Sequence, residues 1–201
     1  MKKIYINILV TLMLIGGVTI IVNINSSNAT SDYSKNFKAE YEALNDLYNS
    51  NKKSVRMNIP LDNPIVYSNL TEILDVIKTK TGIVYFGFPE CPWCRNAVPV
   101  LLDSAKNNNI EKIYYLNPKD YRNLDNRDYQ ELVSILNPYL KEDENGIKKL
   151  YVPDVYFIKD GKVVGNHLGT VDSQDDPYVA LTDNQRKELY NIYSDLLNKI
   201  K

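Results

Sequence analysis

The chain has 201 residues, with 24 Lys and Arg against 25 Asp and Glu. This balance excludes the basic surface expected of a nucleic-acid-binding protein, and it leaves no polybasic patch for a membrane surface. The apolar content of 44% is ordinary for a folded chain. Sixteen tyrosines against four phenylalanines indicate that much of the core is built from Tyr.

The chain begins with a membrane-targeting segment. Two lysines precede a predominantly apolar run over residues 4–22, which at helical rise is about long enough to cross a bilayer. Lysines before the run and none directly after it predict an N-terminus inside and a domain outside. Because Ser27-Asn28-Ala29 resembles a cleavage site, residues 1–25 are either a single-pass anchor or a signal peptide removed near that site. Both alternatives deliver the folded part across the membrane, where a disulfide persists.

Residues 26–54 are expected to form a tether and a short helix. The stretch from Ser26 to Ser34 is small and polar, as in a tether. Apolar side chains then recur at helical intervals and predict an amphipathic helix that covers the sheet; they are Phe37, Tyr41, Leu44 and Tyr48. The domain proper is predicted to occupy residues 55–201.

The first half of that domain alternates strands and helices. Candidate strands cover residues 55–59, 64–67, 83–86 and 110–116. Asn69 followed by Glu72 fits a capping box and predicts a helix start. That helix buries Leu70, Ile73, Leu74 and Ile77, and a second helix after Cys94 buries Val98, Leu101, Leu102 and Ala105.

The second half ends in a hairpin and a helix. A polar stretch over 117–126, a helix over 128–140 and a charged loop over 141–149 precede two strands joined by Asp160-Gly161, a strong hairpin signal. An irregular acidic stretch leads to a closing helix over 182–200. This order predicts an α/β fold, with a central mixed sheet and helices on both faces.

The chemistry lies in Cys91-Pro92-Trp93-Cys94, which holds the only two cysteines of the chain. A strand delivers them to a helix N-terminus, whose unpaired N–H groups and partial positive charge stabilise a thiolate. The pKa of Cys91 should therefore fall. Pro92 suits the first turn, where its missing N–H does no harm. We expect Cys91 to be the exposed catalytic attacker and the buried Cys94 to resolve the mixed disulfide.

These elements resemble the thioredoxin superfamily over roughly residues 55–200. Pro99 stands where thioredoxins carry a helix-kinking proline, and Val152-Pro153-Asp154 is similar to their cis-proline loop. The resemblance implies a three-layer sandwich, a cis bond before Pro153, and packing of that proline against the two sulfurs. It also implies that the backbone of Val152 is exposed to pair with a substrate peptide.

More narrowly, the chain resembles the bacteriocin transport accessory proteins of Gram-positive bacteria. These are thioredoxin-like chains with a membrane leader and an expanded region before the cis-proline, to which residues 117–126 and 141–149 correspond. The resemblance implies exported, cysteine-containing polypeptides as substrates, including a small antimicrobial peptide, and a redox partner that it does not identify. It implies no cofactor beyond the Cys91–Cys94 disulfide.

The chain departs from thioredoxin next to the cysteines. Tyr85 stands where thioredoxins bury an aspartate that helps the second cysteine lose its proton. Glu90 or water is the alternative proton acceptor. Trp93 is expected to contact substrate beside the sulfur. Arg95 is expected either to stabilise the Cys91 thiolate or to lie at the surface.

We therefore predict an extracytoplasmic thiol–disulfide oxidoreductase. The alternative is a non-catalytic binding module or accessory factor for peptide export, with a static disulfide. A metal site is not expected, because two cysteines and the lone His167 do not supply the four ligands of structural zinc. A Cu(I) carrier is a third reading, but no Met-rich or His-rich stretch favours it.

Overall fold

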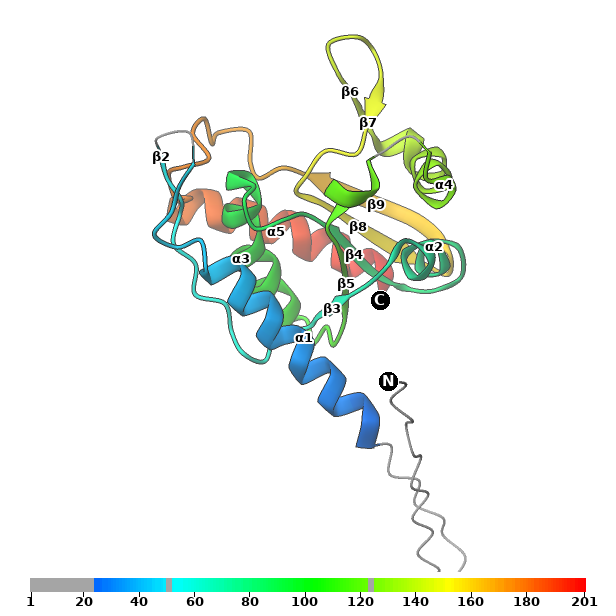
Figure 1. Ribbon diagram of the computed structural model, residues 1–201, viewed down its shortest axis with the longest axis horizontal. Coiled ribbons are helices and arrows are strands. Elements are labelled where there is room, and N and C mark those ends of the chain that lie inside the picture. The colour runs from blue at the N-terminus through cyan, green and yellow to red at the C-terminus, as the bar shows by residue number, and fades with distance from the viewer. Residues whose placement is uncertain (1–23, 50–51, 123–124) are drawn as a thin grey trace, which may run out of the picture.

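The computed structural model describes residues 24–49, 52–122 and 125–201. Its centre is a five-stranded mixed sheet with the strand order β3-β5-β4-β8-β9 (Figure 1). β5 is parallel to both β3 and β4, whereas β8 is antiparallel to β4 and to β9. The strands are β3 (Ile65–Tyr67), β4 (Gly82–Phe86), β5 (Ile113–Leu116), β8 (Asp154–Lys159) and β9 (Lys162–Leu168).

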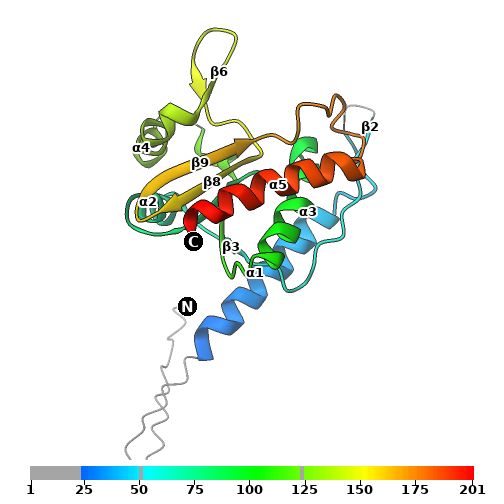
Figure 2. The same cartoon turned by 180° about the vertical axis from the view of Figure 1, so that it is seen from behind.

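Five helices cover the two faces of this sheet, which confirms the predicted fold class. One hydrophobic cluster joins the sheet to α1 (Ile24–Glu42), α3 (Pro92–Asn107) and α5 (Asp183–Ile200). A second cluster joins the opposite face to α2 (Leu70–Thr79) and α4 (Arg127–Leu136). Figure 2 shows α1, α3 and α5 together on one side, with α2 and α4 on the other.

Strand β4 is buried on both faces because its side chains alternate between the two clusters. Ile83 and Tyr85 belong to the cluster under α3, while Val84 and Phe86 belong to the cluster under α2. This alternation follows from the period of two along a strand, and the continuous apolar run is typical of a central strand in such a sheet. β4 therefore holds the start of α3 against the middle of the core.

Local signals in the sequence set several element boundaries as predicted. Asn69 and Glu72 form the expected capping box of α2. In the hairpin turn, Asp160 and Gly161 both have positive φ, 50° and 71°, as a tight hairpin requires. A Cβ on Gly161 would lie 2.2 Å from the carbonyl oxygen of Lys78, so only glycine fits there.

The predicted strand over residues 55–59 is wrong. This segment is irregular, because side chains rather than a neighbouring strand satisfy its backbone. Asn45 exchanges hydrogen bonds with the amide and carbonyl of Met57, at 2.7 and 2.8 Å. The Ile59 amide donates to the Glu42 carboxylate at 2.7 Å.

The predicted tether over residues 26–34 is also wrong, and so is the predicted domain start at residue 55. Residues 26–34, expected as a tether, lie within α1, and residues 24–42 contain no Pro or Gly to break that helix. Phe37 and Tyr41 are fully buried in the core, so α1 belongs to the domain. The helix ends at Glu42, six residues before Tyr48, which is 70% exposed rather than on its apolar face.

The remaining differences concern short elements. α4 ends at Leu136 and continues only as a 3-10 turn, Asn137–Tyr139, because Pro138 interrupts the α-helix. The expected charged loop is a hairpin of β6 (Lys141–Glu142) and β7 (Lys148–Lys149). A second small hairpin joins β1 (Tyr48–Asn49) and β2 (Lys52–Lys53), and a 3-10 turn covers Pro118–Tyr121.

The predicted membrane segment over residues 4–22 lies outside the described residues. Of the helices within the described ranges, none has the length and apolar character needed to cross a bilayer.

Candidate active site

Cys91 lies at the helix start that the sequence predicts. It is the N-cap residue of α3, and its sulfur accepts a hydrogen bond from the Cys94 amide at 3.2 Å. Pro92 occupies the first turn of the helix, where no amide hydrogen is needed. The sulfur of Cys91 thus takes the place that a Ser or Asp side chain takes in an ordinary N-cap.

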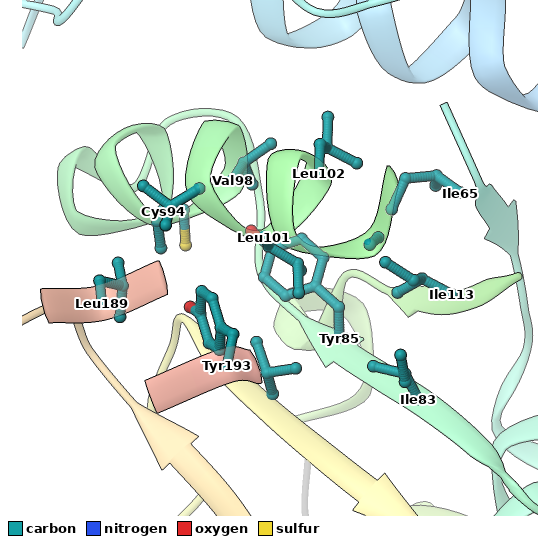
Figure 3. Packing of buried hydrophobic residues seen from close by; sticks show 14 of the residues in the cluster. Ile65, Ile83, Tyr85, Cys94, Val98, Leu101, Leu102, Ile113, Leu189 and Tyr193 are labelled. Carbon is teal, nitrogen blue, oxygen red and sulfur yellow. The ribbon is translucent and has the colours of Figure 1, made fainter. Parts of the chain in front are cut away.

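Cys94 is fully buried, as expected, but Cys91 is not the exposed residue that we predicted. Only 6% of Cys91 is exposed, because the partly buried Trp93 and Val152 pack against the same cluster. Figure 3 shows Cys94 pointing from α3 into the core towards α5. Both cysteines are free thiols, so the structure represents the dithiol form.

The two thiols have opposite electrostatic settings. A hydrogen bond from the Cys94 thiol lowers the pKa of Cys91, and the amides of Cys94 and Trp93 and the charge of Arg122 act in the same direction. Burial raises the pKa of Cys94 well above its usual value, and the neighbouring Cys91 raises it further. Cys91 is therefore the thiol that ionises first, while Cys94 retains its proton.

The loop before β8 meets Cys91, as the resemblance to thioredoxins implies. The Val152–Pro153 peptide bond is cis, and the Cys91 thiol donates to the Val152 carbonyl at 3.7 Å. Pro153 is buried and its carbonyl accepts from the Gly169 amide. Within the described ranges the Val152 amide has no hydrogen-bond acceptor. A backbone donor is thus available beside the reactive sulfur.

Tyr85 packs in the core beside Cys94 and is joined to the N-terminal helix. Its hydroxyl lies 2.8 Å from the hydroxyl of Tyr41, and both residues are fully buried. Burial raises the pKa of Tyr85 well above its usual value, so its hydroxyl stays protonated. A hydrogen bond from Tyr85 acts to lower the pKa of Cys94, against the larger effect of burial. Helical spacing indicated that Tyr41 faces inward, but no local signal indicated its partner.

The other predicted site residues are placed as follows. Glu90 is exposed, with the Lys119 ammonium 3.5 Å from its carboxylate, so it lies outside the buried cluster. Pro99 lies within α3. Their roles, like substrate contact by Trp93, stay predictions.

Arg95 is not a surface residue, and its hydrogen-bond partners do not include Cys91. It is 1% exposed, and its guanidinium donates to the carbonyls of Tyr41 and Val55, each at 2.8 Å. It also donates to Asn45 at 2.8 Å and Pro89 at 3.4 Å. A cation at the C-terminus of α1 favours that helix end, and Arg95 ties α1 to the start of α3.

The sequence reasoning missed one buried acid next to the cis-proline. Asp154 is 1% exposed and accepts a hydrogen bond from the Asn166 amide at 2.9 Å. Burial raises its pKa to about 7. Because it alternates with Val155, its side chain belongs to the α2 and α4 side of the sheet, away from the cysteines. An acid at the start of an otherwise apolar strand was the only signal in the sequence.

His167 is a packing residue, as its strand position suggested. Its Nε2 donates to the Thr170 carbonyl at 2.5 Å and its ring meets Tyr193 edge-on. In the acidic stretch, Asp176 pairs with Lys52 at 2.8 Å. In the part of the chain that the structure describes, no group of three or more His, Cys, Asp or Glu is arranged to hold a metal ion.

No model of a known family matches the chain. No curated protein matches it either. Among solved structures it is similar to oxidised thioredoxin O2 from Arabidopsis thaliana, with 16% identity, 69% of this chain and 96% of that chain covered, and a TM-score of 0.40.

Other similar structures are of the same kind. One is a putative oxidoreductase with a thioredoxin fold, at 19% identity and a TM-score of 0.40; the match covers 52% of this chain and 82% of that chain. Another is oxidised thioredoxin from Plasmodium falciparum, at 18% identity and a TM-score of 0.38; the match covers 65% of this chain and 96% of that chain. Likenesses at this level carry no argument about activity, which has to be built from the geometry of the site.

Proposed function

We propose that the chain is a thiol–disulfide oxidoreductase of thioredoxin type, with Cys91 and Cys94 as its redox pair. One observation carries the proposal: Cys91 caps α3 with its sulfur and meets the Val152 carbonyl, while Cys94 lies buried beside it. A static structural pair would need no separation of the two thiol pKa values, whereas a nucleophile and a resolving thiol do.

The chemistry requires two exchange steps. The Cys91 thiolate attacks one sulfur of a substrate disulfide, so that a bond from Cys91 to substrate forms, the substrate S–S bond breaks, and the released thiolate takes a proton from water. Cys94 then loses its proton and attacks the Cys91 sulfur, which expels the second substrate thiolate. Two electrons and two protons pass to the substrate and a Cys91–Cys94 disulfide remains. The reverse sequence oxidises a substrate dithiol.

Substrate would bind along the Val152 segment. An extended peptide that pairs with the free Val152 amide lies beside the Cys91 sulfur, which holds the reacting atoms together. Trp93 borders the same position and adds an apolar contact. Because Cys91 is largely covered, a flexible peptide fits this approach better than a rigid protein surface.

The location and substrates belong to the same proposal. The apolar run over residues 4–22 supports an extracytoplasmic domain, either anchored or released near Ala29. Cysteines of exported polypeptides, among them a small antimicrobial peptide, are then the substrates, and a separate redox protein restores the starting state of the pair. The resemblance to bacteriocin transport accessory proteins supports this assignment.

One observation favours a non-catalytic alternative. With only 6% of Cys91 exposed, the chain would bind an exported peptide without exchanging disulfides. Disulfide exchange on a model substrate separates the two functions directly.

The test is a pair of cysteine variants. Cys91→Ser should abolish reduction of insulin disulfides, because no thiolate remains to attack. Cys94→Ser should accumulate mixed disulfides that gel mobility under non-reducing conditions reveals, because the resolving thiol is missing. Full exchange activity in Cys91→Ser would end the proposal, and a wild-type chain that binds peptide without any exchange would favour the binding module.

A further inference from the structure

The structure contains a cavity whose lining ends one residue before Val152. This cavity of about 520 Å³ lies between α4 and the β6–β7 hairpin, in the size range of ligand pockets. In Figure 1 this hairpin stands next to α4, apart from the central sheet. Its walls are Tyr129, Gln130 and Val133 on α4, residues 147–151 of the hairpin and following segment, and Arg122.

The lining of this cavity is mainly apolar and partly exposed. Two of the lining side chains are exposed large hydrophobics, Ile147 at 57% and Tyr151 at 39%. Leu150, by contrast, is 2% exposed and anchors the wall to the core. Exposed apolar side chains around a concavity are a typical sign of a binding site.

The cavity lining and the segment that contacts Cys91 are adjacent in sequence. Leu150 and Tyr151 line the cavity, and the next residue, Val152, accepts the hydrogen bond from the Cys91 thiol. Arg122 connects the two places as well, because its guanidinium donates to the Leu150 carbonyl at 3.2 Å and its charge lowers the pKa of Cys91. The cavity and the Cys91 sulfur thus share the segment around Val152 and the residue Arg122.

We propose that this cavity binds an apolar side chain of the polypeptide substrate, close in sequence to the cysteine that reacts with Cys91. The inference rests on the proposed function. A peptide extended along Val152 advances about 3.3 Å per residue and presents alternate side chains to one face. A side chain a short distance from the reacting cysteine thus reaches the cavity, whose volume accommodates an aromatic ring.

The experiment compares peptides that differ only near their cysteine. The full chain, with its redox pair oxidised, is mixed with single-cysteine peptides that carry Phe or Ala at each position flanking the cysteine, and with glutathione. We expect one Phe position to react about tenfold faster than its Ala counterpart, as burial of one aromatic side chain allows.

The decisive variant fills the cavity. Val133→Trp should reduce the ratio of Phe-peptide to Ala-peptide rates to about one, because the new ring occupies the site. The matched control is Ser134→Trp, an exposed neighbour on α4 that does not line the cavity, and it should keep the tenfold ratio. If Val133→Trp fails to fold, Ile147→Ser, at an exposed position, should lower the ratio severalfold.

The outcomes distinguish this inference from the proposed function. Exchange with glutathione and both peptides at equal rates would overturn the cavity assignment and leave the redox function standing. A Phe preference that survives both Val133→Trp and Ile147→Ser would also overturn it. No exchange with peptide or glutathione would instead overturn the proposed function, and the cavity assignment with it.

Discussion

The two faces of the central sheet bury their polar groups differently. Under α1, α3 and α5, the hydroxyls of Tyr41 and Tyr85 share a hydrogen bond within the cluster that contains Cys94. Under α2 and α4, the Asp154 carboxyl accepts from Asn166, and burial raises its pKa to about 7. A buried phenol stays neutral at physiological pH, whereas this carboxyl changes charge there. The sheet therefore lies between Asp154 and the two cysteines.

This difference bears on how Cys94 loses its proton. A neutral Tyr85 donates a hydrogen bond to the Cys94 thiolate and stabilises it, but it does not accept the proton. The acceptor must be water or another base that arrives with the substrate. At the position where the resemblance to thioredoxins implies a buried aspartate, Tyr85 would thus act as a hydrogen-bond donor and not as a proton acceptor.

The largest effect on stability is expected where α1 packs on the sheet face that carries the cysteines. Phe37→Ala should lower the free energy of unfolding by about 3–5 kcal/mol, because Phe37 is fully buried and meets Tyr115 edge-on at 5.1 Å. Chemical denaturation measures the change. Leu61→Ala, at a position 61% exposed, is the control and should change little. A small loss in Phe37→Ala would show that α1 is an appendage after all.

On the opposite face, Asp154 should contribute to the pH dependence of stability. Because the folded pKa of Asp154 is about 7, above the unfolded value of about 3.9, its contribution is fully present below about pH 4 and is lost as pH rises through about 7. Asp154→Asn should remove this loss, at most about 4 kcal/mol, and stabilise the chain at about pH 8 relative to wild type.

Denaturation midpoints at about pH 5 and about pH 8 check this prediction. The control is Asp172→Asn, at an exposed position, which should leave the wild-type pH dependence in place. If Asp154→Asn left the pH dependence of stability unchanged, the proposed electrostatic difference between the two faces would be contradicted.

The smallest effect should distinguish two tyrosine hydroxyls on opposite faces, of which Tyr85 is fully buried and Tyr139 partly buried. Tyr85→Phe removes the hydroxyl that lies 2.8 Å from the Tyr41 hydroxyl and also hydrogen-bonds Cys94. Tyr139→Phe removes one hydrogen bond, to the Val163 carbonyl at 3.0 Å. Each should cost about 1 kcal/mol of stability. Only Tyr85→Phe should also slow release of the mixed disulfide, a fewfold, because the Cys94 thiolate loses a donor. Single-turnover release rates across pH measure this step, and equal rates in the two variants would contradict a role for Tyr85.

Local patterns were enough to predict most elements and the position of the two cysteines at a helix start. The alternation around β4, the capping box at Asn69 and the Asp160-Gly161 turn each act over a few neighbouring residues, so their effect is readable in order along the chain. The placement of Cys91 at a helix start and the cis bond before Pro153 were predicted in the same way, the second through a family resemblance.

Contacts between distant residues were not predictable from such patterns. Arg95 reads as an ordinary helical cation, yet it is buried because the carbonyls of Tyr41 and Val55 converge on its guanidinium. The exposed Cys91 of the sequence prediction is covered in the structure because Val152, far along the chain, folds over it.

The sequence by itself determined where the two sulfurs stand on their helix, since a cap and a turn need only neighbouring residues. Tertiary structure alone decided what surrounds them: the Tyr85–Tyr41 pair, the cover over Cys91, and a cavity that opens beside Val152. The physical reason is that burial and electrostatic environment depend on which distant segments meet, and no periodicity within one segment records its partners.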